Sequence, residues 1–299
     1  MEILVVGSVA FDSIETPFGK KDDVLGGSAT YFSTAASFFA GVQLVAVVGE
    51  DFPDEPRQFL TSRGVDLTGL QTRPGKTFRW KGRYGYDLNE AHTLETHLNV
   101  FETFHPQLPQ AYRQAEYVFL ANIDPELQLE VLQQVNRPKL IACDTMNFWI
   151  EGKRDALVKT LGHVDILVIN EAEARQLAEE ANLVKASKQI LAFGPKTLVV
   201  KRGEYGVLVF SEHSIFSAPA YPMEEVFDPT GAGDTFAGGF MGYLAAPNNL
   251  NDESIRKATV FGSIMASFTV EDFSLNRLRS LDWTEVEDRF RRFQALTVF

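Results

Sequence analysis

A carboxylate, Asp234, follows the small residues Gly231, Ala232 and Gly233 and precedes an apolar segment that predicts a helix. Small residues let the backbone approach a ligand closely, and the exposed N–H groups of a first helical turn attract phosphate. A carboxylate repels a bound phosphate, so its natural functional role there is to accept a proton from an attacking hydroxyl. The spacing therefore predicts phosphoryl transfer, with an N-capping aspartate after a glycine turn as the structural alternative.

The composition of the 299-residue chain is that of an ordinary globular protein, with 45% hydrophobic and 23% charged residues. A formal net charge of −12 argues against a broad nucleic-acid or anionic-membrane surface, because such surfaces need clustered Lys and Arg. The single cysteine, Cys143, excludes an internal disulfide. No run of 18 apolar residues and no signal-peptide pattern occurs, so we expect a cytoplasmic protein without a membrane or nucleic-acid partner.

Short apolar runs alternate with longer amphipathic segments along the chain. The expected strands cover residues 3–6, 42–48, 117–120, 140–143, 166–169 and 198–200. The expected helices cover residues 29–40, 126–135, 171–180, 185–192, 235–245, 253–269 and 283–293. This alternation predicts an α/β fold with a mainly parallel sheet and helices on both of its faces. Residues 207–210 and 214–217 predict an antiparallel edge to that sheet.

Two segments, residues 13–25 and 69–100, interrupt the alternation and are expected to form a separate small β-sheet. The core would then consist of residues 1–12, 26–68 and 101–299. Open α/β sheets bind ligands beyond the carboxyl ends of their strands, so a small sheet folded there would form a lid. A surface hairpin that covers nothing functional is the alternative.

Other chemistries find little support in the motifs. Gly75-Lys76-Thr77 ends like a Walker A loop, but the segment between Gly69 and Gly75 is one residue too long. Phe236 stands where a dinucleotide fingerprint beginning at Gly231 needs its third glycine. The five histidines show no metal-ligand spacing joined to cysteines. A nicotinamide-dependent oxidoreductase is therefore only a remote alternative.

Five segments stand in order along the chain: residues 26–29 (GGSA), 49–51 (GED), 170–173 (NEAE), 201–206 (KRGEYG) and 228–236 (DPTGAGDTF). Together they resemble the ribokinase-like, or phosphofructokinase-B, family of carbohydrate and nucleoside kinases, nearly from end to end. The resemblance implies a ribokinase-like three-layer α/β/α sandwich with a small β-sheet lid, and ATP and Mg²⁺ as cofactors. It also implies that Asp234 is the catalytic base and that Gly231, Ala232 and Gly233 form the anion hole.

The resemblance places the nucleotide and its metal beside residues from two later strands. Asn170 and Glu173 would lie near magnesium and the phosphates and act through waters, although the same pair can simply cap a helix. Lys201, Gly203 and Gly206 would border the nucleotide. For Lys201, a solvated charge at a strand end is the alternative.

The acceptor side of the site is expected after the first strand. By the resemblance, Asp12 would hydrogen-bond substrate hydroxyls, and Gly26 and Gly27 would let the substrate pack against the backbone. A turn-forming aspartate is the alternative for Asp12. Tyr31 stands where many sugar kinases of the family carry an asparagine, so it either stacks on a sugar ring or nucleobase or is a core aromatic.

The chain departs from the family pattern at two further places. Residues 144–147 (DTMN) lack the arginine of the Asp-x-Asn-x-Arg pattern of many relatives, although Asp144 still ends a strand. Residues 271–274 (EDFS) replace the glycine-containing loop that commonly binds a monovalent cation, which makes potassium dependence doubtful. Asp228, which lies near that cation in relatives, can here simply cap a turn.

The residues and the resemblance together predict an ATP-dependent kinase that phosphorylates an alcohol group of a small sugar or sugar-derived substrate. A nucleoside or hydroxymethyl-heterocycle kinase of the same family is an alternative that the sequence leaves open. A non-catalytic sugar or nucleotide sensor is the alternative from another class. An exposed aromatic face on the lid would favour a homodimer formed through it.

Overall fold

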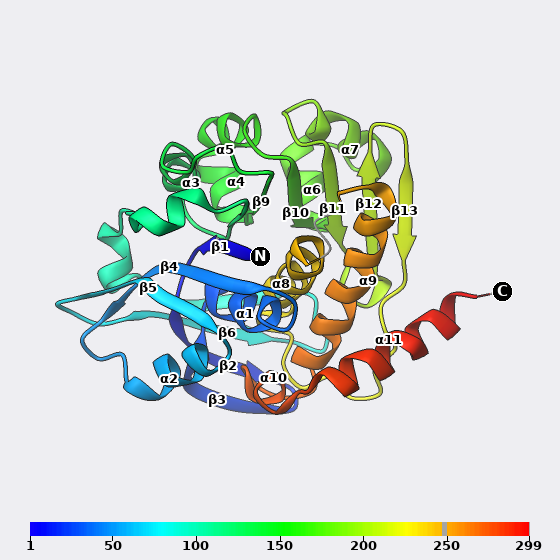
Figure 1. Ribbon diagram of the computed structural model, residues 1–299. Helices are drawn as coiled ribbons and strands as arrows, with labels where there is room; N and C mark the ends of the chain where they lie inside the picture. The colour runs from blue at the N-terminus through cyan, green and yellow to red at the C-terminus, as the bar shows by residue number, and fades with distance from the viewer. Residues whose placement is uncertain (247–249, 299) are drawn as a thin grey trace.

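Two sheets organise the protein in this computed structural model, which describes residues 1–246 and 250–298 (Figure 1). The larger sheet has nine strands and the smaller has four. The range 101–299 expected for the core includes residues 247–249 and 299, which lie outside the described part of the chain.

The larger sheet is parallel over most of its width. Its spatial order is β13 (Ile215–Ala218), β12 (Val207–Ser211), β11 (Thr197–Lys201), β10 (Ile166–Asn170), β9 (Leu140–Asp144), β8 (Tyr117–Leu120), β1 (Glu2–Val6), β4 (Gly41–Gly49) and β5 (Val65–Arg73). Strand β1 pairs in parallel with β4 and with β8, whereas β12 pairs antiparallel with β11 and β13. The predicted parallel sheet and its antiparallel edge are both confirmed.

Helices cover both faces of this sheet, which gives three layers (Figure 1). One face packs against α1 (Ser28–Ala36), α2 (Asp54–Ser62), α8 (Ala232–Ala245), α9 (Asp252–Thr269), α10 (Asn276–Ser280) and α11 (Trp283–Thr297). The other packs against α3 (Pro125–Leu132), α4 (Asn147–Gly152), α5 (Arg154–Leu161), α6 (Glu171–Ala178) and α7 (Leu183–Leu191). Short 3₁₀ helices are η1 (Asn99–Thr103), η2 (Gln110–Gln114) and η3 (Gly203–Tyr205). The three-layer α/β/α architecture is thus confirmed.

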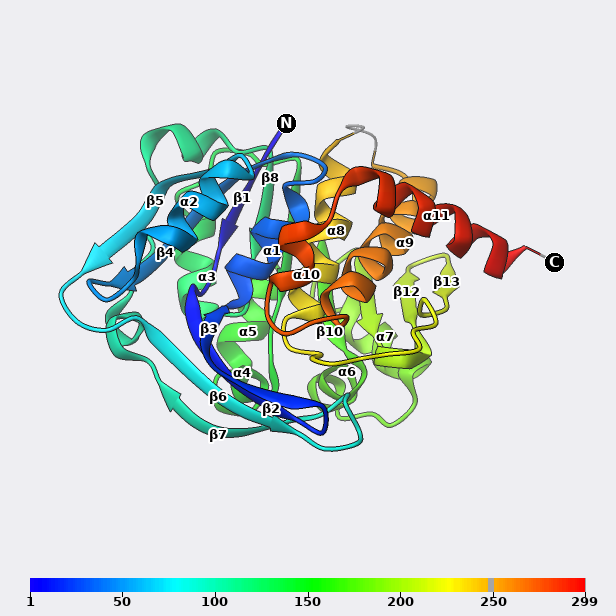
Figure 2. The same cartoon turned by 90° about the horizontal axis from the view of Figure 1, so that it is seen from below.

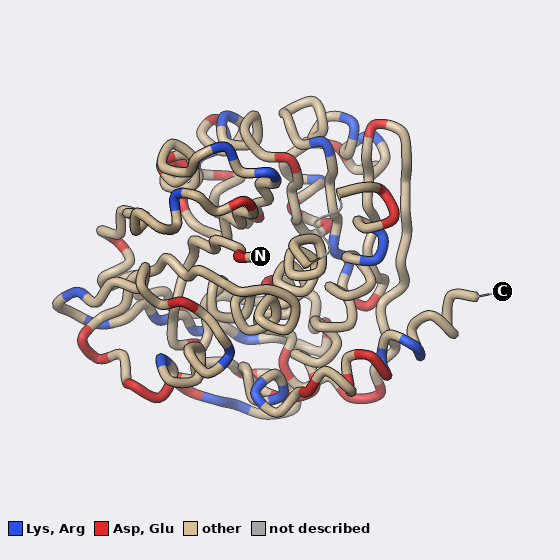
Figure 3. Tube along the Cα trace, in the orientation of Figure 1, with Lys and Arg blue, Asp and Glu red and all other residues tan. Residues whose placement is uncertain are grey.

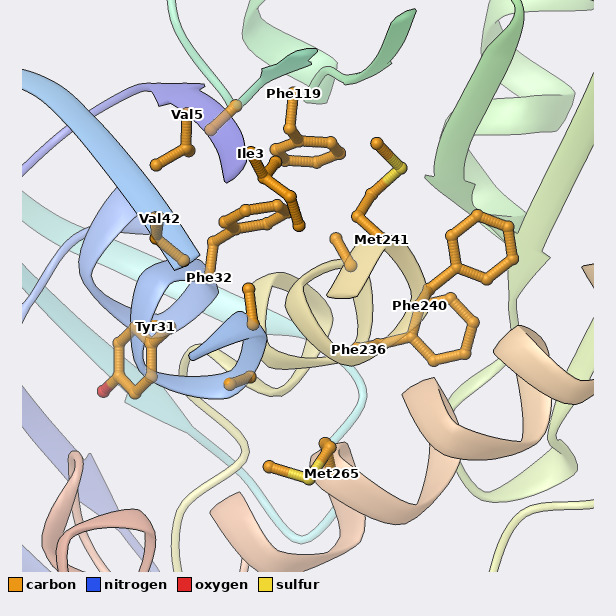
Figure 4. Packing of buried hydrophobic residues seen from close by; sticks show 14 of the residues in the cluster. Ile3, Val5, Tyr31, Phe32, Val42, Phe119, Phe236, Phe240, Met241 and Met265 are labelled. Atoms are coloured by element: carbon orange, nitrogen blue, oxygen red, sulfur yellow. The ribbon is translucent and has the colours of Figure 1, made fainter. Parts of the chain in front are cut away.

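The core on the α1 and α8 face is rich in aromatic side chains (Figure 4). Phe32 of α1 stacks on Phe119 of β8, with ring centroids 4.3 Å apart, and both side chains are fully buried. Burial of each such ring contributes roughly 2–3 kcal/mol. This packing fixes α1 and α8 against the strands, and α8 begins at the predicted catalytic motif. In the described ranges, no helix combines the length and apolar character needed to cross a bilayer.

The smaller sheet has the order β3 (Gly19–Gly26), β2 (Ala10–Thr16), β6 (Phe78–Tyr84) and β7 (Ala91–His97). Strands β2 and β6 are parallel, and the two outer pairs are antiparallel. Figure 2 shows the sheet lying across the end of the molecule toward which β1 points. The predicted small sheet therefore exists, at the carboxyl ends of the parallel strands.

Two boundaries of the small sheet differ from those expected. Residues 69–73, which the sequence placed with the lid, belong to β5, because residues 45–49 of β4 pair with them in the large sheet. Strand β2 begins at Ala10, so residues 10–12 lie in the small sheet instead of the core. The division of the chain into a core domain and a lid domain stays a prediction.

Acidic and basic residues intermingle along the chain trace (Figure 3). Near the C-terminal end of α9, Glu271 accepts from Arg277 Nε at 2.7 Å and from Arg289 at 2.5 Å. Both arginines are largely shielded from solvent, so these pairs are stronger than exposed ones. Two arginines therefore neutralise Glu271, the first residue of the segment 271–274.

Candidate active site

The N-terminus of α8 forms the centre of the candidate site. Gly231 is the N-cap residue with φ of 74°, a left-handed conformation that favours glycine. Ala232 donates its N–H to the Pro229 carbonyl at 3.1 Å. Within the described residues, the N–H groups of Gly233 and Asp234 have no backbone acceptor. The Gly233 N–H is a free donor at the positive end of a 14-residue helix and fits an anion, whereas the Ala232 N–H is engaged in the turn and the Asp234 N–H is hydrogen-bonded to its own carboxylate.

Asp234 lies in the first turn of α8 beside one lysine. A Cβ atom on Gly233 would lie 2.7 Å from Lys201 Nζ, so the ammonium group sits directly against the turn. Burial raises the pKa of Asp234 to about 6, and the charge of Lys201 opposes that rise. A carboxylate with this pKa is ionised near neutral pH and is still basic enough to take a proton from a reacting hydroxyl.

Asp228 fixes the turn that leads into α8. Its Oδ1 accepts the Thr230 N–H at 2.9 Å, and its Oδ2 accepts the Ser274 N–H at 3.0 Å. The side chain is fully buried, and burial raises its pKa. Asp228 therefore ties the turn before α8 to the loop after α9, and both of its oxygens are occupied. The expectation that potassium dependence is doubtful stays a prediction.

Asp12 of β2 reaches the same region from the small sheet. It is buried, and burial raises its pKa to about 7; the Gly27 N–H opposes that rise, whereas Asp228 and Asp234 add to it. A Cβ atom on Gly26 would overlap the Asp12 carboxylate, and Gly27 has φ of 93°. The glycine pair is therefore needed to seat Asp12, a role that the sequence analysis did not foresee.

Asn170 and Glu173 form a capping box at the start of α6. Asn170 Oδ1 accepts the Glu173 N–H at 2.8 Å, and Glu173 Oε2 accepts the Asn170 N–H at 2.8 Å. The capping alternative is therefore confirmed. Burial raises the pKa of Glu173, and the negative charge of Asp234 raises it further, whereas the positive charge of Lys201 lowers it. Glu173 therefore interacts electrostatically with the residues of the α8 turn.

Asp144, at the end of β9, is a further carboxylate of the site. It is buried, and its Oδ1 has no hydrogen-bond partner among the described residues. Burial raises its pKa, and the charges of Asp234 and Glu173 raise it further, against Lys201. Three carboxylates thus surround one ammonium group. An excess of negative charge with an unsatisfied carboxylate oxygen fits a divalent cation with oxygen ligands such as Mg²⁺.

The loop after β11 meets the tip of the small sheet. The Asn89 amide oxygen, from the connection between β6 and β7, occupies the space that a Cβ atom on Gly203 would need. Gly206 has φ of 84°, and the Ala218 carbonyl leaves no room for a side chain there. Gly206 is therefore structurally required, whereas Gly203 leaves room for the Asn89 side chain. Of the three residues predicted to border the nucleotide, Lys201 is the one that lies against the α8 turn.

Two tyrosines complete the surroundings of α8. The ring of Tyr31 packs where a Cβ atom on Gly231 would lie, and its hydroxyl points away from the apolar cluster in Figure 4. Tyr31 thus belongs to the hydrophobic core, which agrees with the interpretation of this residue as a core aromatic. Tyr84, at the end of β6, accepts a hydrogen bond from Thr230 Oγ1 at 3.3 Å. The small sheet therefore touches the predicted catalytic motif itself.

The sequence model of pfkB family carbohydrate kinases matches residues 19–279 of the chain. The chain belongs to this family. A cytidine kinase of Thermococcus kodakarensis is 34% identical over 248 residues, which cover 81% of this chain and 87% of the relative. As a pfkB family member with such relatives, the protein is a phosphotransferase that acts on a hydroxyl group.

Solved structures share the pfkB-type fold at low sequence identity. An E. coli structure, named as a ribokinase II in complex with ATP and Mg²⁺, has a TM-score of 0.78 at 19% identity, and the match covers 97% of this chain and 99% of that chain. A nucleoside kinase of Burkholderia thailandensis in complex with inosine has a TM-score of 0.77 at 17% identity, over 98% and 99% of the two chains. These similarities confirm the ribokinase-like fold class.

Sequence reasoning on this pfkB family chain missed one site residue and gave another no role. Tyr84 was not singled out within residues 69–100, because its partner Thr230 is 146 residues away in the chain. Asp144 was noticed for its position at a strand end, but its orphaned oxygen and its charged neighbours appear only in three dimensions. The strand-end position was the one signal in the sequence.

Proposed function

We propose that the protein transfers the γ-phosphoryl group of ATP to a hydroxyl of a nucleoside, at the sugar part of that substrate. One observation carries the choice of a nucleoside: a relative named as a cytidine kinase is 34% identical over 81% of the chain. The E. coli neighbour with ATP and Mg²⁺ supports the nucleotide as donor. A free sugar or sugar-derived acid is the second candidate, because Asp12 beside the glycine pair fits any diol.

The two carboxylates Asp12 and Asp234 divide the work in this proposal. Asp12 accepts hydrogen bonds from the acceptor's hydroxyls and holds the sugar against Gly27, while Asp234 accepts the proton of the hydroxyl that attacks the γ-phosphorus. The free N–H group of Gly233 and the Lys201 ammonium then stabilise the charge that spreads over the transferred phosphoryl oxygens. Alignment of donor and acceptor supplies much of the remaining acceleration.

Magnesium, when bound, neutralises phosphate charge and orients the phosphates. Asn170 and Glu173 would reach it through waters, as the capping box occupies Asn170 Oδ1 and one Glu173 oxygen. Asp144 Oδ1, which has no partner within the described ranges, is the third candidate to face it. The positive charge of Lys201 offsets part of the negative charge of the three surrounding carboxylates, which reduces their repulsion of an incoming polyphosphate.

The small sheet acts as the lid in this proposal. It contributes Asp12 from β2 and Tyr84 from β6, and its tip places Asn89 against Gly203. Exclusion of water by this sheet would limit hydrolysis of ATP.

The test is a coupled assay of ADP release with Mg·ATP against nucleosides, pentoses, hexoses, sugar acids and hydroxymethyl heterocycles. We expect acceptor-dependent ADP release, with kcat/KM highest for a nucleoside. A preference for free sugars over every nucleoside would overturn the nucleoside assignment in favour of the second candidate. Release of ADP without any dependence on an acceptor would contradict both.

A further inference from the structure

The inner face of the small sheet can be identified from its register. Asp12 of β2 pairs with Trp80 of β6, and Ile14 pairs with Gly82, without a register shift in this parallel pair. Side chains alternate between faces along a strand, so Trp80, Gly82 and Tyr84 share the face of Asp12. Asp12 and Tyr84 both lie at the α8 turn, so Trp80 lies on the face that looks into the site.

The indole of Trp80 lies flat against this face. A Cβ atom on Gly82 would overlap the Trp80 atoms Cη2 and Cζ2, so the six-membered ring covers Gly82. Trp80 Nε1 donates to Thr93 Oγ1 of β7 at 3.1 Å, which fixes the five-membered ring of the indole. Gly82 is buried, whereas Trp80 itself keeps partial exposure. One side of the indole thus packs on the sheet, and the other side stays open.

We propose that this open side of Trp80 is the platform on which the base of the nucleoside acceptor stacks. Neighbouring strands are about 4.8 Å apart, so a ribose held by Asp12 places its base directly beside the Trp80 strand. An indole attracts the π-face of any base, and its one polar atom is already satisfied by Thr93. A free sugar offers only C–H groups to the ring and has no conjugated π-face. This inference rests on the nucleoside acceptor proposed above.

The size of the effect follows from typical stacking energies. Loss of one aromatic platform weakens the interaction with a base by about 5- to 140-fold. Selectivity is the sharpest readout, because ribose shares the sugar hydroxyls of a nucleoside but has no base. Trp80→Leu should lower the ratio of kcat/KM for cytidine to kcat/KM for ribose by about this factor.

The control for this experiment is Trp283→Leu. Trp283 is 42% exposed on α11, and its Nε1 bonds to Glu287 in the same helix. The control variant should keep the wild-type ratio. Thermal unfolding of each variant identifies any that fails to fold. Gly82→Ala gives an independent perturbation, since its Cβ displaces the indole without removing it. It should lower the ratio in the same direction as Trp80→Leu.

Binding is measured separately by fluorescence, in the double variant Trp149→Phe, Trp283→Phe, which leaves Trp80 as the sole tryptophan. Cytidine should quench this emission, and ribose should not. An unchanged ratio of kcat/KM in Trp80→Leu, with the wild type active on nucleosides, would overturn the platform and leave the nucleoside kinase standing. Activity on sugars alone, with Trp80 quenched by cytidine, would support the platform and overturn the nucleoside assignment. Activity on sugars alone without quenching would overturn both.

Discussion

Replacement of Asp12 by asparagine should stabilise the fold in a manner that depends on pH. The side chain is 5% exposed, and burial raises its pKa from 3.8 to about 7. An acid whose folded pKa lies above its unfolded pKa weakens the fold as pH rises, because the unfolded chain gives up the proton first. The penalty is absent below pH 3.8 and complete above about pH 7. Asparagine keeps the shape beside Gly26 and carries no charge.

The magnitude follows from the pKa difference. About three units between 3.8 and 7 correspond to about 4 kcal/mol at pH 8. At pH 5 the pH has passed only the first part of the interval between the unfolded and folded pKa values, so the penalty on the folded state is about 2 kcal/mol. The stabilisation of Asp12→Asn should therefore be more than twice as large at pH 8 as at pH 5. Its KM for the acceptor should rise, because an amide holds a diol less strongly than a carboxylate does.

Urea unfolding of wild type and Asp12→Asn at pH 5 and pH 8 tests this reasoning. The midpoint should shift upward at both pH values and further at pH 8, with an unchanged m-value. Asp22→Asn on β3 is the matched control, since its carboxylate is 61% exposed, and it should show no such pH-dependent gain. Equal stabilisation of Asp12→Asn at both pH values, or a loss at pH 8, would refute the electrostatic account.

Two further predictions concern the α8 turn. Lys201→Met removes the charge that opposes the raised pKa of Asp234, so the acidic limb of the profile of kcat/KM against pH should move to higher pH; kcat at pH 7 should fall about 100-fold. Rate measurements from pH 5 to 9 check this, and an unmoved limb would contradict it. Gly231→Ala forces a side chain into a left-handed conformation and against the Tyr31 ring, which should cost about 3 kcal/mol in urea unfolding. Wild-type stability in this variant would show that the turn adapts freely.

The strands could be predicted from the sequence because each buried strand is a continuous run of apolar residues. Residues 117–120 were expected as a strand and form β8 with the same bounds, since a parallel strand buried on both faces needs a continuous apolar run. Helix ends were less accurate. Helix α1 was expected to reach residue 40 but ends at Ala36, where Phe38 and Phe39 continue in tighter turns. Apolar periodicity does not distinguish those turns from a helix.

The site was predictable where it lies within one segment and not where distant segments meet. The motif around Asp234 revealed the turn at the start of α8, for which we propose anion binding, because turn residues and helix start are contiguous. The fit of Asp12 into the space above Gly26 and the stacking of Tyr31 under Gly231 depend on tertiary packing. The error at residues 69–73 has the same origin. Only pairing with β4 shows that these residues belong to the large sheet.

In the proposed reaction, Asp234 accepts the proton of the attacking hydroxyl during transfer from ATP. The most direct measurement is acceptor-dependent ADP release by wild type and Asp234→Asn, together with their affinities for Mg·ATP by calorimetry. We expect the variant to lose phosphoryl transfer by at least about 1,000-fold, within the range known for general bases, while it binds ATP with nearly wild-type affinity. Turnover close to that of the wild type would contradict the claim.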